Sequence, residues 1–353
     1  ILRYEKFLQD KHVMNESDFI AIRTEFKKDI NAAVEKALTH LPITPNSYTE
    51  LEDVFAPFEY KEAQPAAAEN EMRMIDAISD GLNEAMKKHS NLILMGQDIA
   101  EYGGVFKITD GFFDKYGKER VRNTPLCESA IIGAALGLSL KGFKAMVEMQ
   151  FADFVTCGFN QIVNNLAKLH YRWGQHADVV IRMPTGGGVG AGPFHSQSNE
   201  AWFTHVPGLK VVYPSNPFDV KGLLLTAFED VNPVLFFEHK ALYRSQSRMV
   251  PEGYYNIPFG KAAVARQGNG MTIVTYGMGV HWALKEAEEN KEADIEVIDL
   301  RTLVPLDVET VLASVRKTNK VIVLHEDTLF GGLGGEIASI ISEKAFEYLD
   351  STF

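Results

Sequence analysis

Glu128 is the residue of this chain whose surroundings are best suited to chemistry. It follows Pro125, which favours the turn before a helix, and it precedes an almost entirely small or apolar run, Ala130–Leu140. The spacing predicts a buried helix with Glu128 in its first turn. A carboxyl group held in apolar surroundings binds a proton readily and can take part in acid–base catalysis. The plainer alternative is an acid that the helix dipole stabilises by a few tenths to about 1 kcal/mol.

His195 is the second candidate, at the end of the glycine-rich stretch Thr185–Pro193. A dinucleotide site needs a helix directly after the glycines and an acid about twenty residues later, and this sequence provides neither. We therefore interpret the stretch as a flexible loop that presents His195 to a cleft. A surface or capping role is the alternative for His195, and His205 is expected to be structural.

A third candidate is the aromatic stretch Met149–Phe154, which is expected at the end of a strand and leads into a helix. Ligands of open parallel sheets bind beyond the carboxyl ends of the strands. Glu128 also precedes a helix of this sheet, so the candidates are expected to converge on one edge. Packing in the core is the alternative for the aromatic residues.

The first seventy residues predict helices and a connection rather than a sheet. Residues 1–45 are expected to be helical, because apolar residues recur at helical spacing after the capping residues Asn15–Asp18. Residues 46–70 are rich in Pro, Thr, Ser, Glu and Ala, which indicates a linker.

The rest of the chain alternates helices with strands. Residues 71–250 contain mainly apolar strands. One of them, Asp178–Met183, shows no polar alternation until Arg182, which is typical of a parallel sheet covered on both faces. We expect one long helix at Asp153–Trp173. Residues 251–353 repeat the alternation on a smaller scale. The sequence thus predicts an α/β fold of two parallel-sheet, three-layer domains preceded by a helical extension.

Composition excludes several classes of function. The chain has 353 residues and a net charge of −12 without any basic block, so nucleic acid and anionic membranes are poor partners. Cys127 and Cys157 form no CxxC pair, which favours a reducing compartment and no zinc site. No apolar run approaches the ~20 residues of a membrane helix, and no signal peptide is expected. Because the sequence opens on Ile1 within a helical pattern, we expect it to be part of a longer polypeptide.

Short motifs follow one another in a characteristic order from Gly96 to Glu326. They are Gly96–Phe106, Asn123–Glu128, Gln150–Phe154, Arg182–Gly188, His195–Ser198, Pro207–Val212, Lys221–Leu224, Asp299–Leu303 and His325–Glu326. Through them, residues 71–353 resemble the beta subunit of the thiamin-diphosphate-dependent 2-oxoacid dehydrogenases, the decarboxylating E1 component. Residues 1–41 resemble the tail of the partner alpha subunit, which suggests an alpha–beta fusion that lacks most of its alpha part here.

The resemblance implies roles for several residues of a thiamin diphosphate site. Glu128 is implied to hydrogen-bond N1′ of the pyrimidine and to assist formation of the ylid, with Leu126, Gln150 and Phe154 around the ring. Phe154 stands where the family often has Tyr and therefore lacks a hydroxyl group. His195 is implied to protonate intermediates, or the dithiolane when the acyl group passes to lipoamide.

The resemblance also implies metals and partners. The diphosphate and Mg²⁺ are expected in the alpha part, since no Gly-Asp-Gly followed by a paired Asn occurs in this chain. A monovalent cation, K⁺ in particular, is implied at backbone carbonyls of Ala177, Val179, Val180, Asp230 and Asn232. The implied partners are the alpha part of E1, a second beta part and the lipoyl domain of the E2 acyltransferase. The implied compartment is the cytoplasm of a bacterium, or the mitochondrial matrix in a eukaryote.

The implied activity is decarboxylation of a small branched-chain 2-oxoacid, of the 2-oxoisovalerate type, with reductive acylation of lipoyl-E2. The branched-chain substrate is favoured by the sequences around Phe194–Ser198 and His325–Gly332. Pyruvate dehydrogenase E1 beta, a transketolase-like carbon–carbon transferase and a non-enzymatic assembly domain are the alternatives. The chain is expected to hold only part of the active site, to lack the usual end of the beta subunit and to associate through Asp153–Trp173.

Overall fold

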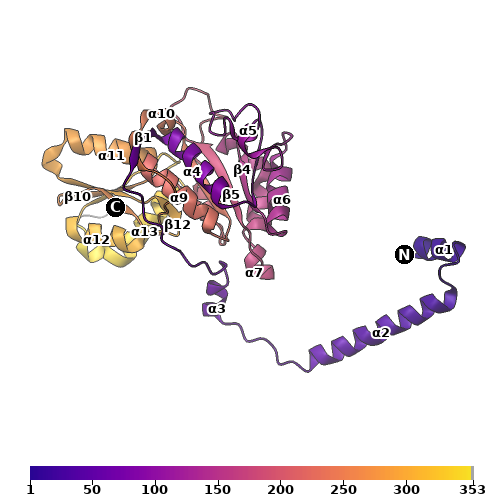
Figure 1. Cartoon of the computed structure of the whole chain (residues 1–353). Coiled ribbons are helices and arrows are strands. Elements are labelled where there is room, and N and C mark those ends of the chain that lie inside the picture. Colours follow the sequence, from indigo (N-terminus) through magenta and orange to yellow (C-terminus); the bar gives the residue numbers. More distant parts are fainter. Residues whose placement is uncertain (351–353) are drawn as a thin grey trace. The chain divides into compact units, whose positions relative to one another are not determined.

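The computed structural model describes residues 1–350, and the chain divides into two units, Ile1–Leu51 and the part from Glu52 onward (Figure 1). The first unit contains α1 (Leu2–Asp10) and α2 (Glu16–Leu38), as the apolar spacing predicts. Asn15 caps α2, because its side chain accepts from the amides of the first turn while Asp18 accepts from the Asn15 amide at 2.8 Å.

A seven-stranded sheet organises the second unit, in the order β12-β6-β7-β5-β4-β2-β3. Neighbouring strands are parallel except at one edge, where β12 runs antiparallel to β6. The strands are β2 (Leu92–Gly96), β3 (Val121–Asn123), β4 (Lys144–Glu148), β5 (Val179–Thr185), β6 (Lys210–Val212), β7 (Val234–His239) and β12 (Thr302–Val304).

Alternate residues of the central strands enter two separate cores, one on each face of this sheet. Ala145 and Val147 of β4 pack in the core that includes α6 (Glu128–Ser139). Met146 packs in the other core, with α4 (Met74–Lys88) and α9 (Pro217–Glu229), two helices that lie against each other (Figure 1). Burial on both faces explains why these strands are mainly apolar without polar alternation.

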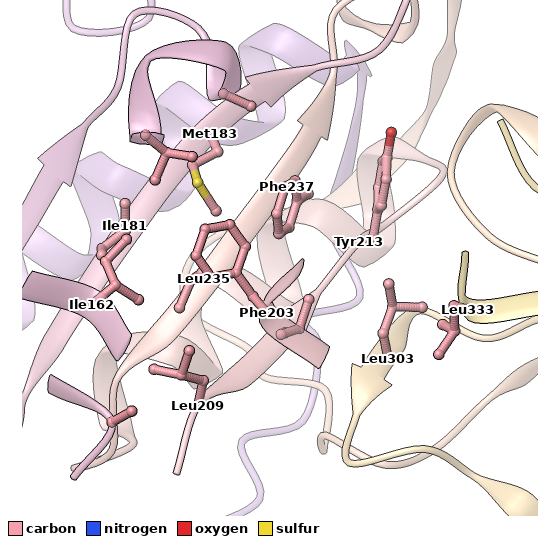
Figure 2. Packing of buried hydrophobic residues seen from close by; sticks show 14 of the residues in the cluster. Ile162, Ile181, Met183, Phe203, Leu209, Tyr213, Leu235, Phe237, Leu303 and Leu333 are labelled. Atoms are coloured by element: carbon pink, nitrogen blue, oxygen red, sulfur yellow. The ribbon is translucent and has the colours of Figure 1, made fainter. Parts of the chain in front are cut away.

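A smaller, four-stranded sheet follows in the order β13-β10-β11-β9, with β9 antiparallel to β11. Its strands are β9 (Ala263–Arg266), β10 (Met271–Thr275), β11 (Ile295–Asp299) and β13 (Val321–Val323), and its helices are α11 (Met278–Glu289), α12 (Val308–Thr318) and α13 (Leu333–Ala345). Leu303 and Leu333 from this part of the chain lie near Tyr213 in the core of the large sheet (Figure 2). The two sheets therefore share one hydrophobic core.

Short elements complete the described part of the chain. Strands β1 (Glu69–Arg73) and β8 (Ser247–Pro251) form an antiparallel ribbon. The remaining elements are α3 (Ser47–Glu52), α5 (Phe112–Tyr116), η1 (Ala152–Gly158), η2 (Gln161–Leu166), α7 (Leu169–Trp173), α8 (Ala201–Thr204), α10 (Leu242–Ser245), η3 (Lys291–Ala293) and η4 (Phe346–Tyr348). Within residues 1–350, no helix combines the length and the apolar character needed to cross a membrane.

The segment between α3 and β1 follows the surface of the second unit as a strap, residues 53–68. Two asparagine side chains hold it through its backbone. Asn232 accepts from the Ala56 amide at 2.8 Å and donates back to the Ala56 carbonyl at 3.0 Å. Asn256 accepts from the Ala63 amide at 2.6 Å and donates to the Lys61 carbonyl at 2.8 Å. Much of the predicted linker is therefore fixed in place.

Two predictions about helices are wrong. The segment Asp153–Trp173 is helical almost throughout, as expected, but it is not one α-helix, because it consists mainly of the 3-10 helix η1, the π-helix η2 and the short α7. The first of these turns packs closely on α6, since a Cβ on Gly158 would lie only 2.3 Å from Ile132. Helix α6 is buried on one face only, because Ala130 and Ala134 are exposed on the other.

Candidate active site

The carboxyl ends of the parallel strands lie at one edge of the large sheet, where ligands of such sheets bind. The chain leaves β2 at Gln97, β4 toward Gln150, β5 into the glycine-rich stretch and β7 at Lys240, while Glu128 opens α6 after β3. The residues singled out from the sequence therefore follow strand ends at a common edge.

Glu128 is the first residue of α6 and is 7% exposed. Gln97 Nε2 donates to Glu128 Oε1 at 3.2 Å, so an amide holds one oxygen of the carboxyl group. No group in the described part of the chain donates to Oε2. Leu126, by contrast, is 80% exposed, which leaves an apolar side chain uncovered close to a buried acid.

His195 stands between two aromatic rings. Its ring meets Phe151 edge-on at a centroid distance of 4.6 Å and Phe154 at 5.5 Å. The two phenylalanine rings are 5.7 Å apart and also meet edge-on, so the three side chains form one cluster. Such edge-to-face pairs stabilise by roughly 0.5–1.5 kcal/mol each beyond the area they bury. The structure thus joins the aromatic stretch and the histidine, which the sequence separates.

The aromatic stretch also lies against the helix that begins with Glu128. A Cβ on Gly158, in η1 after Phe154, would approach the Glu128 carbonyl oxygen to 3.4 Å. Gln150 is half-buried and donates to Asp98 at 3.4 Å, just beyond the end of β2. An acid, an amide, an aromatic wall and an exposed leucine therefore occupy one region of the sheet edge.

A buried charge network lies beneath this edge. Arg182 is fully buried in β5 and donates to Glu238 with two nitrogens at 2.7 and 2.6 Å and to Glu148 at 2.5 Å. Tyr243 donates to Glu238 at 2.7 Å. Burial raises the pKa of Glu148, while the charge of Arg182 acts against this. The signal in the sequence was Arg182 itself, the one charged residue in the otherwise apolar strand.

The five residues expected at a monovalent cation lie close together. All are buried, at the start of β5 and in the turn before β7, and the Ala177 amide donates to the Val231 carbonyl at 3.1 Å. The side chain of Asp230 binds Lys210, and the side chain of Asn232 holds the strap. The candidate ligands of a cation among these residues are therefore their backbone carbonyl oxygens. Residues 1–350 contain no group of three or more His, Cys, Asp or Glu side chains arranged to hold a metal.

Gln97, Lys240 and the partners of Arg182 were not predicted as parts of this region. Lys240 Nζ donates to the Gly186 carbonyl at 2.7 Å, and burial lowers the pKa of Lys240 to about 8. Gln97 and Lys240 directly follow strands, and the glutamates that bind Arg182 lie within strands. The order of strands in the sheet therefore decides which side chains these residues contact. That order is not visible in a local pattern.

Comparison with known proteins supports the arrangement along most of the chain. The description "Transketolase, pyrimidine binding domain" matches residues 70–246, and "Transketolase, C-terminal domain" matches residues 260–353. A solved structure, a split-gene transketolase described as an inactive beta4 tetramer, superposes with a TM-score of 0.64. It is 26% identical, and the match covers 78% of this chain and 85% of that one. The chain is thus a transketolase-like α/β protein.

Relatives of known name are more similar still. The 2-oxoisovalerate dehydrogenase subunit beta of Bacillus subtilis is 46% identical over 79% of this chain and 87% of its own length. The mitochondrial 2-oxoisovalerate dehydrogenase subunit beta of Dictyostelium discoideum is 43% identical over 88% and 82%. The pyruvate dehydrogenase E1 component subunit beta of Bacillus subtilis is 43% identical over 80% and 88%. The chain belongs to the family of 2-oxoacid dehydrogenase beta subunits.

The resemblance and the fold class predicted from the sequence are confirmed by these matches. Both sheets are dominated by parallel strands, as expected, and each carries one antiparallel strand that was not predicted. The likeness of residues 1–41 to an alpha-subunit tail stays a prediction.

Proposed function

We propose that this chain supplies the pyrimidine-binding half of a thiamin diphosphate site in an E1 enzyme. The complete enzyme would decarboxylate a branched-chain 2-oxoacid and transfer the acyl group reductively to the lipoyl group of E2. The observation that carries the proposal is the buried Glu128 carboxyl, held by Gln97 through one oxygen and free at the other.

The residues at the sheet edge fit an aromatic ring with a basic nitrogen. Glu128 Oε2 can carry a proton toward such a nitrogen, and Leu126 offers an uncovered apolar surface that would exclude water from the contact. Phe154 can pack on the face of the ring, and Gln150 adds an amide. When bound, thiamin diphosphate supplies a nucleophilic carbon and an electron sink for decarboxylation.

The side chains at the sheet edge have distinct roles in the proposed site. Gln97 orients Glu128 so that Oε2 faces outward, and Glu128 holds or releases a proton at that atom. His195 moves a proton at one of its ring nitrogens when the acyl group leaves for the lipoyl group. The phenylalanines on either side fix the plane of the imidazole but bind neither nitrogen. Phe154 carries no hydroxyl group, so its side chain offers the ring no hydrogen bond.

The remaining parts of the site are assigned to other groups. The diphosphate and Mg²⁺ would be bound by the alpha part of E1. K⁺ would be bound by the backbone oxygens of the five buried residues at the start of β5 and before β7. A second beta part and the lipoyl domain of E2 complete the proposed assembly. Association through residues 153–173 predicts a dimer or larger species in light scattering, and a clean monomer would count against it.

The branched-chain substrate is supported by the 46% identity to a 2-oxoisovalerate dehydrogenase subunit, against 43% for the pyruvate dehydrogenase subunit of the same organism. Pyruvate is therefore the second candidate. Reconstituted E1 should turn over 2-oxoisovalerate faster than pyruvate, with ferricyanide or a lipoyl domain as the acceptor. Equal turnover would remove the preference, and turnover of ketose phosphates instead would replace the proposal with a transketolase-like transfer.

The role of Glu128 is tested by Glu128→Gln in the reconstituted enzyme. The variant keeps the shape of the side chain but carries no titratable proton, so exchange of the cofactor C2 proton should be abolished. Glu119 is an exposed acid just before β3, the strand that Glu128 follows. Glu119→Gln is therefore the control, and with it the cofactor C2 proton should exchange at the wild-type rate. Wild-type exchange in Glu128→Gln would refute the role.

A further inference from the structure

The loop that carries His195 is an arm, residues 186–197, with an exposed tip and a closed base. Gly188–Phe194 are all exposed. At the base, the Gly186 amide donates to the Gln197 carbonyl at 3.1 Å, and this bond brings the two ends of the arm together. The position of His195 therefore depends on what holds the base of the arm.

Glu326, in the loop after β13, holds that base with both carboxylate oxygens. Oε1 accepts from the Gly187 amide at 2.7 Å, and Oε2 lies 2.5 Å from His239 Nε2. The amide of Ala241 donates to His239 Nδ1 at 3.3 Å, so the ring carries its proton on Nε2 and donates it to Glu326. One side chain thus bonds the arm and the end of β7 at the same time.

The packing leaves little freedom at this contact. Gly186 has a φ of +82°, and a Cβ there would lie 2.2 Å from His239 Nε2, so the arm approaches the imidazole as only glycine allows. Lys240 donates to the Gly186 carbonyl from the same strand end. Asp153 accepts from the Gln197 amide at 3.2 Å on the other side of the base.

The electrostatics keep Glu326 ionised near neutral pH. Burial acts to raise its pKa, but the hydrogen bond from His239, the Gly187 amide and the charge of Lys240 together lower the pKa below the ordinary value. A charged acceptor makes stronger hydrogen bonds than a neutral one, typically by about a factor of two.

We propose that Glu326 is a positioning residue for acyl transfer, which fixes the arm through Gly187 and so sets where His195 stands. The inference rests on the proposed function, because the task of His195 belongs to it. Glu326 makes no hydrogen bond to Glu128 or Gln97. Its loss should therefore impair the step that uses His195 more than the steps that use Glu128.

The test uses reconstituted E1 with Glu326→Ala, Glu326→Gln and the control Glu343→Gln, an exposed acid on α13. Acylation of a lipoyl domain and decarboxylation coupled to ferricyanide are measured for each. Displacement of a proton-transfer group by about 1 Å costs on the order of 100-fold in rate, so Glu326→Ala should lose about 10- to 100-fold in acylation. Its decarboxylation should stay close to that of the control. Glu326→Gln keeps an acceptor for Gly187 and should lose less.

Hydrogen exchange of peptides from residues 186–197 gives a readout independent of activity. Without its charged acceptor, the Gly187 amide should exchange about tenfold faster in Glu326→Ala than in the control. An unchanged exchange rate, unchanged acylation, or an equal loss of acylation and decarboxylation would each overturn the proposal. If the wild-type enzyme acylates no lipoyl domain, the proposed function fails, and the exchange of Gly187 still decides whether Glu326 holds the arm.

Discussion

Glu200 makes the stability of this protein depend on pH in a direction opposite to that of most acids. It lies at the start of α8, fully buried, and Tyr276 donates to its Oε1 at 2.8 Å while Oε2 has no partner. Burial raises the pKa of Glu200 to about 7, and the charges of Asp327 and Glu326 act in the same direction. The folded protein therefore prefers the neutral form of this side chain.

The sign follows from the proton that each state binds. Below the ordinary pKa of 4.5, both the folded and the unfolded chain carry the proton. Between 4.5 and about 7 only the folded chain keeps it, so the free energy of unfolding falls as the pH rises and becomes level above about 7. At about 1.4 kcal/mol for each tenfold difference in proton affinity, the loss is on the order of 3 kcal/mol.

Glu200→Gln isolates this contribution, because the amide can still accept from Tyr276 but does not titrate. Urea unfolding followed by circular dichroism at several pH values should show the variant gaining about 3 kcal/mol relative to the wild type between pH 4.5 and 8. Glu343→Gln is exposed and should track the wild type throughout. A difference between Glu200→Gln and the wild type that stays constant with pH would refute the reasoning.

Three further outcomes follow from contacts in the second unit. Arg182→Ala should lower the free energy of unfolding by about 3–5 kcal/mol, because it leaves buried glutamates without their partner, and equilibrium denaturation measures this directly. Gly186→Ala should reduce lipoyl acylation more than Gly190→Ala, since both have positive φ but only the first would collide with His239; equal rates would contradict the collision. Asn256→Ala should expose the strap to limited proteolysis at residues 57–66, and an unchanged digestion pattern would show that this clamp is dispensable.

The α/β class could be predicted because the physical cause is local. Strands such as β5 are mainly apolar without polar alternation, and this pattern requires cover on both faces whatever the topology. The close approach of Gly158 to α6 could not be predicted, since it depends on Ile132 of another helix. Strands β9 and β12 are short edge strands that pair with residues far away in the sequence. A local pattern of apolar residues therefore does not predict them.

The site was predictable in the same measure. The position of Glu128 in the first turn of a helix follows from Pro125 and the apolar run, and the structure has it there. Its partner Gln97 comes from a strand that is adjacent only in the folded sheet. Glu326 and His239 are 87 residues apart and meet because the second sheet packs beside the first. The position of a functional residue within one helix or strand can be predicted from the sequence. Contacts between residues of different elements can be predicted only when the strand order is known.

Strand β12 has a consequence for how this protein can be divided. The chain completes β11 of the small sheet and then returns to the large sheet, where β12 pairs with β6. A strand from the C-terminal segment, residues 251–353, therefore forms the edge of a sheet whose other strands come from residues 71–250. A fragment ending near Pro251 would leave unpaired the edge of β6 that faces β12, and the apolar cover over Tyr213 would be missing. Open edges of this kind recruit other chains. The two segments should therefore melt as one cooperative block, and a fragment cut at the family boundary should precipitate rather than fold.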